Sequence, residues 1–527
     1  MNFRSGWSVS GLTLALFAGC ASAQVAAYEI IDLGGLPSPA AQESGAWALN
    51  DRHEVVGWAR DAAYQVHATI WLYCPNYGLT AGEWHDLSDL AGETDTGDAF
   101  DINMSGLVVG RQAVSTSSGS WRGYIWNVAA SPLVTTELGT FTGGATTEGI
   151  ACAVNDASPA IVVGVAEAPD DPCQFHRRMQ AFGYKQGDPP TTLTALGMNP
   201  GNGYSQASGV NNASPPRACG RSTDEKCPTL FCQPDASAVQ WTVSASPTLT
   251  TLPDNGPGYG AQAWGINDAG QSVGLAIETG SSCLKHAAFW ATPTSSPIDL
   301  GSVGIASSYE SRAFRLNEVG PGGVVTVVGS ELTNALAFRW FRDGSGSWTG
   351  VDLNTLISPL CGWTLYEAHD VSSDGWIVGD GLVTPPGSLW PENHAFLLKP
   401  ITCPGDLDGS CTVNGADLGV LLGGWGCGTP CPACRADLNH DGLINGADLG
   451  LLLGAWGATC ECWSCPSGSR VAMEQESPAE AENNLIEGLT ILGLRSVEEF
   501  RAWQSSRSAE QNAEVFEWLF IYLTARN

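Results

Sequence analysis

One unit of sequence recurs seven times between residues 28 and 398, and it constrains the fold more than any other feature of the chain. Its clearest copy reads AQAWGINDAGQSVGLAIE, then KHAAFW, then IDLG, from Ala261 to Gly301. The turn residues of the seven copies are Asn50, Asn103, Asn155, Asn211, Asn267, Asn317 and Ser372. The six steps from the first to the last give a period of about 54 residues, close to the periods of known propeller repeats.

Each copy reads as four short strands. Two alternating apolar segments flank an Asn-Asp or similar turn, and the second ends in Val-Val-Gly or a relative, which is a hairpin pattern. A fourth segment precedes DLG. The third ends in an aromatic residue, usually one of Trp71, Trp126, Trp241, Trp290 and Trp340, which we interpret as core residues. Four strands in each of seven copies predict a mainly β fold, a seven-bladed β-propeller, with an open β-solenoid as the alternative.

The two ends of the repeat region complement each other. The seventh copy stops at HAFLLKP (residues 394–400) and lacks a following DLG strand, whereas the region opens with an unpaired one, YEIIDLGGL, from Tyr28 to Leu36. We expect this first strand to pair with the last copy and close a ring over residues 28–400. Closure would remove the exposed sheet edges.

The repeat resembles the HAF repeat of extracellular bacterial proteins, which is named for a His-Ala-Phe segment. His394-Ala395-Phe396 matches fully, and His67-Ala68 and His286-Ala287 match in part. The resemblance implies an extracellular repeat protein without a defined activity. We interpret the three histidines as packing residues and the turn asparagines as structural, because asparagine tolerates left-handed backbone angles and caps its own turn.

Two related loops follow the repeats. DLDGSCTVNGADLGVLLGGWG begins at Asp406 and DLNHDGLINGADLGLLLGAWG at Asp437. Alternate oxygen-bearing side chains before a glycine bend suit calcium, which takes six to eight oxygen ligands. The predicted ligands, with a backbone carbonyl from Thr412 and Leu443, are Asp406, Asp408, Ser410, Thr412, Asn414 and Asp417 in the first loop and Asp437, Asn439, Asp441, Leu443, Asn445 and Asp448 in the second.

We therefore expect two Ca²⁺ ions as cofactors, the second bound more tightly. Cys411 stands in the first loop where the second has Gly442, and a side chain in a left-handed bend costs strain. A disulfide through Cys411 would instead fix that bend.

ITCPG and CPACRA precede the loops and do not predict the entering helix of a full EF-hand, so each loop has only an exiting helix. This duplicated loop–helix, residues 403–457, resembles a type I dockerin. The resemblance implies a cohesin partner and a place in polysaccharide breakdown. Its candidate recognition positions are Gly415, Ala416, Gly446 and Ala447, small residues where the family commonly has hydroxyls. A cohesin-like partner, an envelope protein and a self-contained calcium-stabilised module all remain open.

The net charge limits the kinds of partner, and the cysteine content indicates the cellular compartment. A net charge of −31 argues against nucleic acid and fits calcium and neutral glycans. Residues 1–23 read as a signal peptide, with a lipoprotein anchor at Cys20 as the alternative, and no later segment is apolar enough to span a membrane. The other 16 of the 17 cysteines predict disulfides in a secreted protein, favoured over zinc at Cys431/Cys434 and Cys462/Cys465.

After the loops we expect a cysteine-rich linker at 458–472 and a helical tail at 473–527. The sequence contains neither GxSxG nor HExxH, and no catalytic residue is nominated. The leading hypothesis is a secreted calcium-binding protein whose propeller binds a ligand, such as a glycan, or a surface. The alternatives are a carbohydrate-active protein such as a glycoside hydrolase, as the dockerin resemblance implies, and a structural envelope protein.

Overall fold

The structure is a computed structural model, and it describes most of the repeat region and the two loops. The described residues are 28–37, 43–92, 96–113, 120–142, 148–169, 178–223, 236–254, 260–277, 284–385, 390–429, 431, 433–460 and 465. The predicted signal peptide with Cys20 and the predicted helical tail lie outside them. Strands dominate the described part, as the mainly β prediction requires, and its helices are short.

Each copy of the repeat forms a hairpin-connected antiparallel sheet in chain order. Four sheets take their strands from one copy each. They are β2 to β5 (Ser44–Leu49, Glu54–Arg60, Val66–Leu72, Trp84–Asp86), β6 to β9 (Gly97–Ile102, Leu107–Ala113, Trp121–Asn127, Val134–Glu137), β18 to β21 (Ala261–Ile266, Ser272–Ile277, Lys285–Trp290, Ile298–Asp299) and β22 to β25 (Ser311–Leu316, Val325–Glu331, Leu336–Arg342, Trp348–Asp352).

Two further copies share one eight-stranded sheet. Its strands are β10 to β13 (Gly149–Val154, Ile161–Glu167, Met179–Lys185, Thr194–Ala195) and β14 to β17 (Tyr204–Val210, Arg217–Thr223, Ser237–Thr242, Thr248–Thr251). Within each copy every pairing is antiparallel. The two copies are joined only where β12 meets β14, by a parallel pairing at Met179 and Tyr204.

The last copy is completed by the first strand of the repeat region. Strands β26 (Thr364–Val371), β27 (Ile377–Val383) and β28 (Glu392–Pro400) form a sheet whose fourth strand is β1 (Tyr28–Asp32). β1 runs antiparallel to β28, with Tyr28 opposite Pro400 and Asp32 opposite Phe396. The predicted pairing of the opening segment with the last copy is confirmed.

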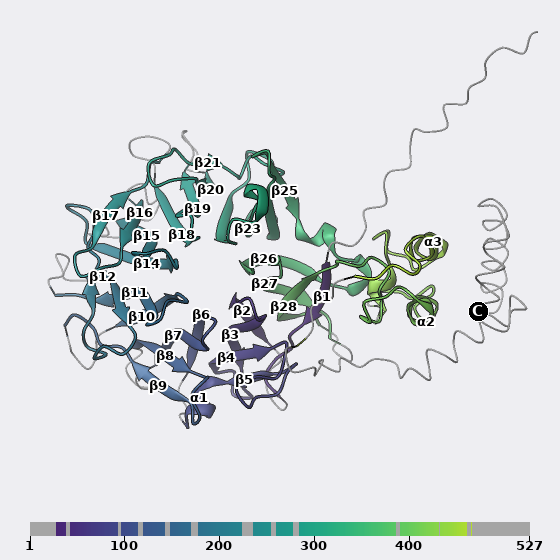
Figure 1. Cartoon of the computed structure of the whole chain (residues 1–527), viewed down its shortest axis with the longest axis horizontal. Helices are drawn as coiled ribbons and strands as arrows, with labels where there is room; N and C mark the ends of the chain where they lie inside the picture. Colours follow the sequence, from purple (N-terminus) through teal and green to yellow (C-terminus); the bar gives the residue numbers. More distant parts are fainter. Residues whose placement is uncertain are drawn as a thin grey trace, which may run out of the picture.

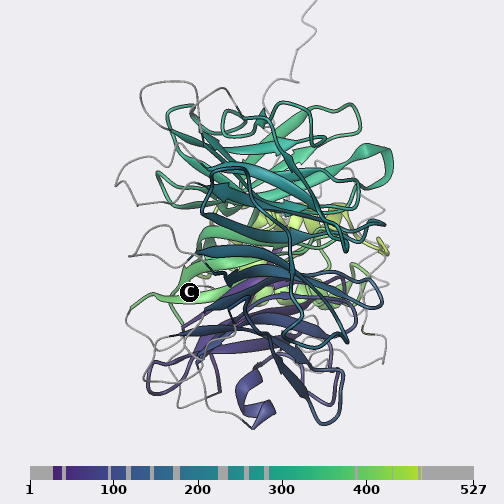
Figure 2. The same cartoon turned by 90° about the vertical axis from the view of Figure 1, so that its left-hand side faces the viewer.

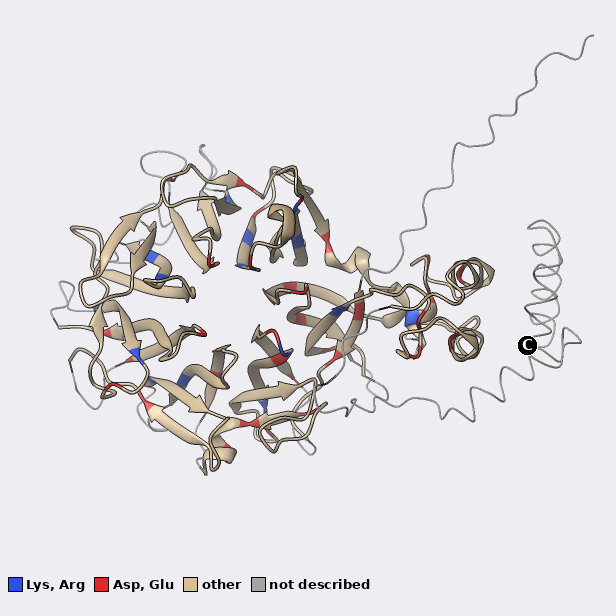
Figure 3. Ribbon diagram, in the orientation of Figure 1, with Lys and Arg blue, Asp and Glu red and all other residues tan. Residues whose placement is uncertain are grey.

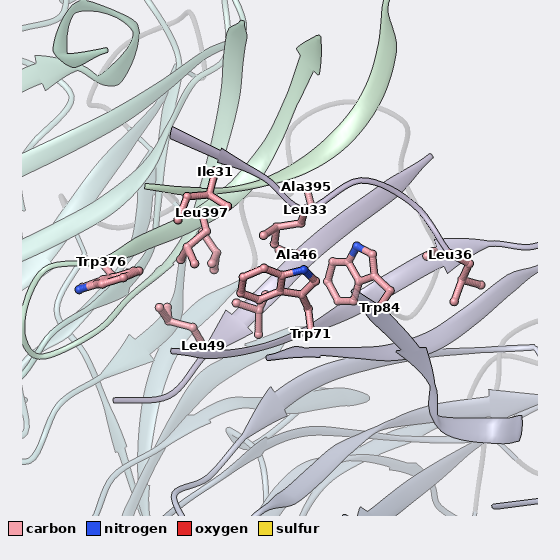
Figure 4. Packing of buried hydrophobic residues seen from close by; sticks show 13 residues of the cluster. Ile31, Leu33, Leu36, Ala46, Leu49, Trp71, Trp84, Trp376, Ala395 and Leu397 are labelled. Carbon is pink, nitrogen blue, oxygen red and sulfur yellow. The ribbon is translucent and has the colours of Figure 1, made fainter. Parts of the chain in front are cut away.

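The sheets stand around a common centre, with β2, β6, β10, β14, β18 and β26 on the inner side (Figure 1). Figure 2 shows the same arrangement edge-on. We call residues 28–400 the ring. Its closure is sealed by apolar packing: Ile31 and Leu33 from the first segment lie against Trp71, Trp84 and Leu397 (Figure 4).

The third-strand tryptophans are core residues, as predicted. Trp71 is 3% exposed, and Trp126, Trp241, Trp290 and Trp340 are at most 1% exposed. Each ends or nearly ends the third strand of its sheet. The ring core is therefore a series of similar clusters between neighbouring sheets, repeated with the sequence.

The turn asparagines form a ladder of hydrogen bonds around the ring. The Nδ2 atom of Asn50 donates to the carbonyl oxygen of Asn103 at 3.2 Å, and Asn103 donates to Asn155 at 2.8 Å. Three more steps of 2.9–3.2 Å continue through Asn211 and Asn267 to Asn317. The structural interpretation of these residues is confirmed, and their amides connect neighbouring sheets.

The backbone reason given for asparagine at these turns is wrong. Among the described residues with positive φ, none is a turn asparagine. The left-handed residue comes three positions later, at His53 (φ 59°), Gly106 (φ 78°) and Gly270 (φ 76°). Asparagine is needed for its amide, which accepts from its own turn and donates to the next sheet.

The three repeat histidines are buried against aspartates. His67 lies 2.8 Å from Asp86, and the corresponding distances are 3.1 Å for His286–Asp299 and 2.8 Å for His394–Asp32. Each aspartate is the last residue of the outermost strand of the same sheet and begins the sequence DLS or DLG. The histidine therefore ties the third strand to the fourth, consistent with a packing role.

The two predicted loop–helix units follow the ring and lie beside the closing sheet (Figure 1). Their helices are α2 (Gly415–Gly423) and α3 (Gly446–Gly454). The described residues contain no helix long and apolar enough to cross a membrane. We call residues 403–465 the C-terminal module.

Candidate calcium-binding module

Each loop is closed by the aspartate in the first turn of its helix. Asp417 is buried, and its Oδ1 accepts from the backbone N–H groups of Leu407 (2.6 Å) and Asp408 (3.0 Å), while Oδ2 accepts from Asn414 (2.7 Å). Asn414 caps α2 in return by accepting from the N–H of Ala416. This reciprocal capping box bends the loop back onto the start of the helix.

The second loop repeats this arrangement. Asp448 accepts from the backbone N–H groups of Leu438 (2.8 Å), Asn439 (3.2 Å) and Asn445 (2.8 Å), and Asn445 caps α3. The aspartate at the twelfth position therefore has a structural function in both loops, in addition to any role as a ligand.

Three carboxylates of the first loop converge. One oxygen each from Asp406, Asp408 and Asp417 lie within 4.8 Å of one another, a spacing that could hold a metal ion. Burial, together with the charge of Asp408, raises the pKa of Asp417 to about 6. Burial and Asp408 likewise raise the pKa of Asp406. A divalent cation would relieve this repulsion, so the donor set fits calcium.

The other predicted ligands of the first loop adjoin this cluster. The Ser410 hydroxyl donates to the carbonyl oxygen of Thr412 at 3.2 Å, and Asn414 Nδ2 donates to the same oxygen at 2.8 Å. The Ser410 hydroxyl and the Asn414 amide nitrogen thus meet at the Thr412 carbonyl, while Asn414 Oδ1 is turned to the start of α2. The structure brings Asp406, Asp408 and Asp417 together, and Ser410, Thr412 and Asn414 lie along the same loop.

The second loop is less compact. Asp437 and Asp448 are buried, but Asp441 is exposed, and the three carboxylates do not form a comparable cluster among the described residues. Asn439 Nδ2 donates to Asp441 Oδ2 at 2.9 Å, and Asn445 Nδ2 to the Leu443 carbonyl at 3.3 Å. The predicted residues again lie along one loop, with the acidic groups further apart.

The strain argument for a tighter second site does not separate the loops. Each loop has two left-handed residues, Gly409 (φ 70°) and Cys411 (φ 70°) in the first, His440 (φ 57°) and Gly442 (φ 84°) in the second. Each therefore has one glycine and one residue with a side chain at these bends. Cys411 is also disulfide-bonded. As stated above, a disulfide through this residue would fix the bend of the first loop.

A hydrogen bond connects the second loop to the ring. The Ser358 hydroxyl donates to Oδ2 of Asp437 at 2.6 Å, and both residues are buried. Ser358 lies in the connection from β25 to β26, between the short helices η2 (Leu353–Leu356) and η3 (Pro359–Cys361). The adjacent Leu360 belongs to the apolar core of the module, and its carbonyl accepts from the N–H of Cys431 at 2.8 Å.

Disulfides reinforce this attachment. The described pairs are two between ring and module, Cys74–Cys465 and Cys361–Cys434, and two within the module, Cys403–Cys460 and Cys427–Cys431. The predicted disulfides are confirmed for these residues, including three of the four CxxC cysteines. Such pairs fit an oxidising environment.

An ion pair adds a further contact between the two parts. Arg435 of the short helix η4 (Cys434–Ala436) lies 3.5 Å from Glu29 of β1. Figure 3 shows acidic positions in red on both the ring and the module, interspersed with basic positions in blue. Sequence reasoning missed the whole docking surface, because Ser358 and Leu360 are ordinary residues in a connecting segment.

The candidate recognition positions differ in exposure. Gly446 and Ala447 are exposed at the start of α3, while Gly415 and Ala416 are half-buried at the start of α2. Only the α3 pair is therefore presented fully to solvent in this arrangement.

Comparisons with known proteins give fold likenesses alone. No model of a known protein family matches the chain, and no curated protein matches it. Among solved structures, a puromycin hydrolase is 12% identical with a TM-score of 0.41, over 67% of this chain and 53% of that one. A post-proline cleaving enzyme from Rickettsia typhi is 11% identical with a TM-score of 0.39, over 66% and 51%. This chain thus spans about half the length of each.

A gluconolactonase from Xanthomonas campestris is 11% identical with a TM-score of 0.31, over 73% of this chain and 93% of that one. None of these three matches reaches a TM-score of 0.5. The site described above therefore stands on its own residues.

Proposed function

We propose that this chain is an extracellular calcium-binding repeat protein. In this proposal a seven-bladed β-propeller serves as a platform for a ligand or a surface, and the C-terminal module is a calcium-stabilised element fixed to it. The observation that carries the calcium assignment is the convergence of Asp406, Asp408 and Asp417 in a loop that leads directly into a helix.

The number of blades depends on whether the eight-stranded sheet is counted as one blade or as two. Its two copies are antiparallel throughout and meet only at the Met179–Tyr204 pairing, so we count it as two blades. With the five four-stranded sheets, this gives one blade for each copy of the repeat. The continuous asparagine ladder across both copies supports the same division.

The resemblance to dockerins suggests an attachment domain, but the contacts of the module with the ring favour a fixed part of the protein. Two disulfides and the Ser358–Asp437 hydrogen bond join the module to the ring, whereas an attachment domain on a free linker would have no such contacts. We propose that calcium primarily stabilises this fixed module. Any cohesin-like or envelope partner would then meet the exposed start of α3, at Gly446 and Ala447.

Secretion is part of the proposal and is supported by the disulfides. The alternative of a glycoside hydrolase rests on the dockerin resemblance alone, and no described residue is assigned to catalysis. The structural envelope protein remains the alternative that would follow if the ring bound nothing.

Calcium binding is testable on the whole protein after treatment with a chelator. We expect calorimetric titration with CaCl₂ to show two bound ions. We also expect calcium to raise the melting temperature, because a bound ion at a hundredfold excess over its Kd adds about 2.7 kcal/mol to the free energy of unfolding. Equal melting in calcium and in chelator, with no heat of binding, would contradict the proposal.

Matched variants separate the two loops. Asp408→Asn removes one carboxylate from the first loop and Asp441→Asn one from the second, and neither is the loop-closing aspartate. We expect each to abolish or weaken one binding event, leaving the other. Asp188→Asn, in an exposed turn after β12, should bind like the wild type.

A further inference from the structure

The inner strand of every sheet contains a β-bulge at the same place in the repeat. In β2, Ala46 pairs with Gly57 and Ala48 with Val56, so Trp47 between them has no partner of its own. The residues skipped in this way are Trp47, Phe100, Cys152, Ser208, Trp264, Phe314 and His369. A bulge redirects its side chain, and these strands lie at the centre of the ring (Figure 1).

Five of the seven bulged side chains are rings that touch in an unbroken series. Their centroids are separated by 6.1 Å for Phe100–Trp47, 4.6 Å for Trp47–His369, 5.2 Å for His369–Phe314 and 5.6 Å for Phe314–Trp264. We call these five residues the aromatic arc. His369 is buried, but the other four are half-buried, so part of each faces solvent.

Three charged residues follow the arc, each directly after a bulged residue. Arg315 donates to the carbonyl oxygens of Trp264 (2.6 Å) and Ser208 (3.3 Å). Asp101 accepts from the N–H of Val154 in the next inner strand at 2.9 Å, and Asp370 from that of Leu49 at 3.1 Å. These groups are held in place by neighbouring sheets, and their remaining lone pairs and N–H groups can meet a ligand.

This group combines one guanidinium with two carboxyl groups, and Glu367 and Asp380 lie beside His369 of the arc. Burial raises the pKa of Asp101 to about 7 and that of Asp370 to about 6, with Arg315 opposing both shifts. Near neutrality, the negative charge of Asp370 and the positive charge of Arg315 offset each other. The carboxylates would repel an anionic ligand, and Arg315 would repel a cationic one.

We propose that the aromatic arc and its charged neighbours bind a neutral carbohydrate at the centre of the ring. The apolar faces of pyranose rings stack on aromatic side chains, and sugar hydroxyls both donate to carboxylates and accept from guanidinium groups. The inference deepens the proposed function, since it names the ligand of the platform.

The test uses the full chain saturated with calcium, titrated with cellohexaose, xylohexaose, mannohexaose and N-acetylchitohexaose. We expect at least one to bind, and Trp47→Ala and Trp264→Ala to weaken it by about tenfold, as loss of an aromatic stacking partner implies. Trp264→Phe should restore most of the affinity. Trp348→Ala is the control, since Trp348 is also half-buried but lies on the outermost strand β25.

Three outcomes would overturn the inference: no binding of any of these sugars at millimolar concentration, binding that Trp348→Ala weakens as much as Trp264→Ala, or binding of tetramethylammonium or oligogalacturonate in their place. Circular dichroism of each variant establishes that it is folded. A calcium titration of the same samples reports on the module, so failure of the sugar site is distinguishable from failure of the proposed calcium function.

Discussion

At five of the hairpin turns, the asparagine side chain bonds both to its own turn and to the corresponding turn of the next copy of the repeat. Asn155 illustrates this: its Oδ1 accepts from the N–H of Ile161 at 2.8 Å, and its Nδ2 donates to the carbonyl of Asn211 at 2.9 Å. Aspartate has no donor for the second bond, and serine is too short to make both. The requirement for an amide explains why six of the seven turns have asparagine.

Asn155→Ala removes both hydrogen bonds from a buried position. We expect a loss of about 2 kcal/mol in the free energy of unfolding, because a backbone donor and a backbone acceptor are left unpaired. Denaturant unfolding would measure it. Asp188→Ala, in an exposed turn, is the control, and equal stability of the two variants would count against the ladder.

The His67–Asp86 pair makes stability depend on pH. Pairing with Asp86 raises the pKa of His67, partly opposed by burial, and Asp61 adds to the increase. A raised pKa in the folded state contributes stability fully below the unfolded value of about 6.5 and loses it as pH rises through the folded value. We therefore expect the wild type to lose this contribution between mildly acidic and mildly alkaline pH.

Asp86→Asn isolates the effect, because asparagine still caps α1 (Leu87–Ala91) as Asp86 does. The stability difference between wild type and variant should be largest below pH 6.5 and shrink at higher pH. Unfolding curves at several pH values measure it. A difference that stays constant with pH would show that the pair does not titrate.

At the scale of the elements, the repeat pattern predicted hairpins, core tryptophans and the pairing of the first strand. These follow from local periodicity, which the sequence displays directly. The bulges at Trp47 and its counterparts could not be predicted, because a bulge adds one residue to an otherwise ordinary alternation. The aromatic arc was missed for that reason, although Trp47 and Trp264 are visible in the repeat alignment.

Closure of the ring by β1 can be tested by shortening one buried apolar side chain of that strand. Ile31→Ala should destabilise the protein by about 2–5 kcal/mol, because Ile31 is 5% exposed between β1 and the first sheet. Ile298→Ala is the matched control, since Ile298 is 38% exposed on β21 and should change stability by no more than about 0.5 kcal/mol. Similar losses in both would mean that β1 does not seal the ring.

At the scale of the whole molecule, ring and module are coupled through the β25–β26 connection. The calcium loops were predictable from their alternating oxygen ligands, but their docking on Ser358 was not. Docking depends on shape and on cysteine pairing between distant segments, and eight cysteines alone allow about 105 pairings. What the sequence suggested as an appendage is, in the structure, part of one assembly.

Ser358→Ala removes the hydrogen bond to buried Asp437 and so probes this coupling. We expect a loss of about 2 kcal/mol, typical of a hydrogen bond to a charged group, and a change in calcium affinity of the second loop only. Ser296→Ala, at an exposed position between β20 and β21, is the control. Unchanged calcium binding and unchanged stability would show that this hydrogen bond does not couple the second loop to the ring.

Strand β1 also imposes an order on synthesis. It leaves the ribosome before every other described strand, and its partner β28 leaves last among the strands of the ring. Through the whole interval the sheet of β2 to β5 can form while β1 lacks its partner β28, with Ile31 and Leu33 uncovered. An unpaired apolar strand is a template for aggregation, so a chain of this design benefits from a chaperone that holds its first residues until the seventh repeat arrives.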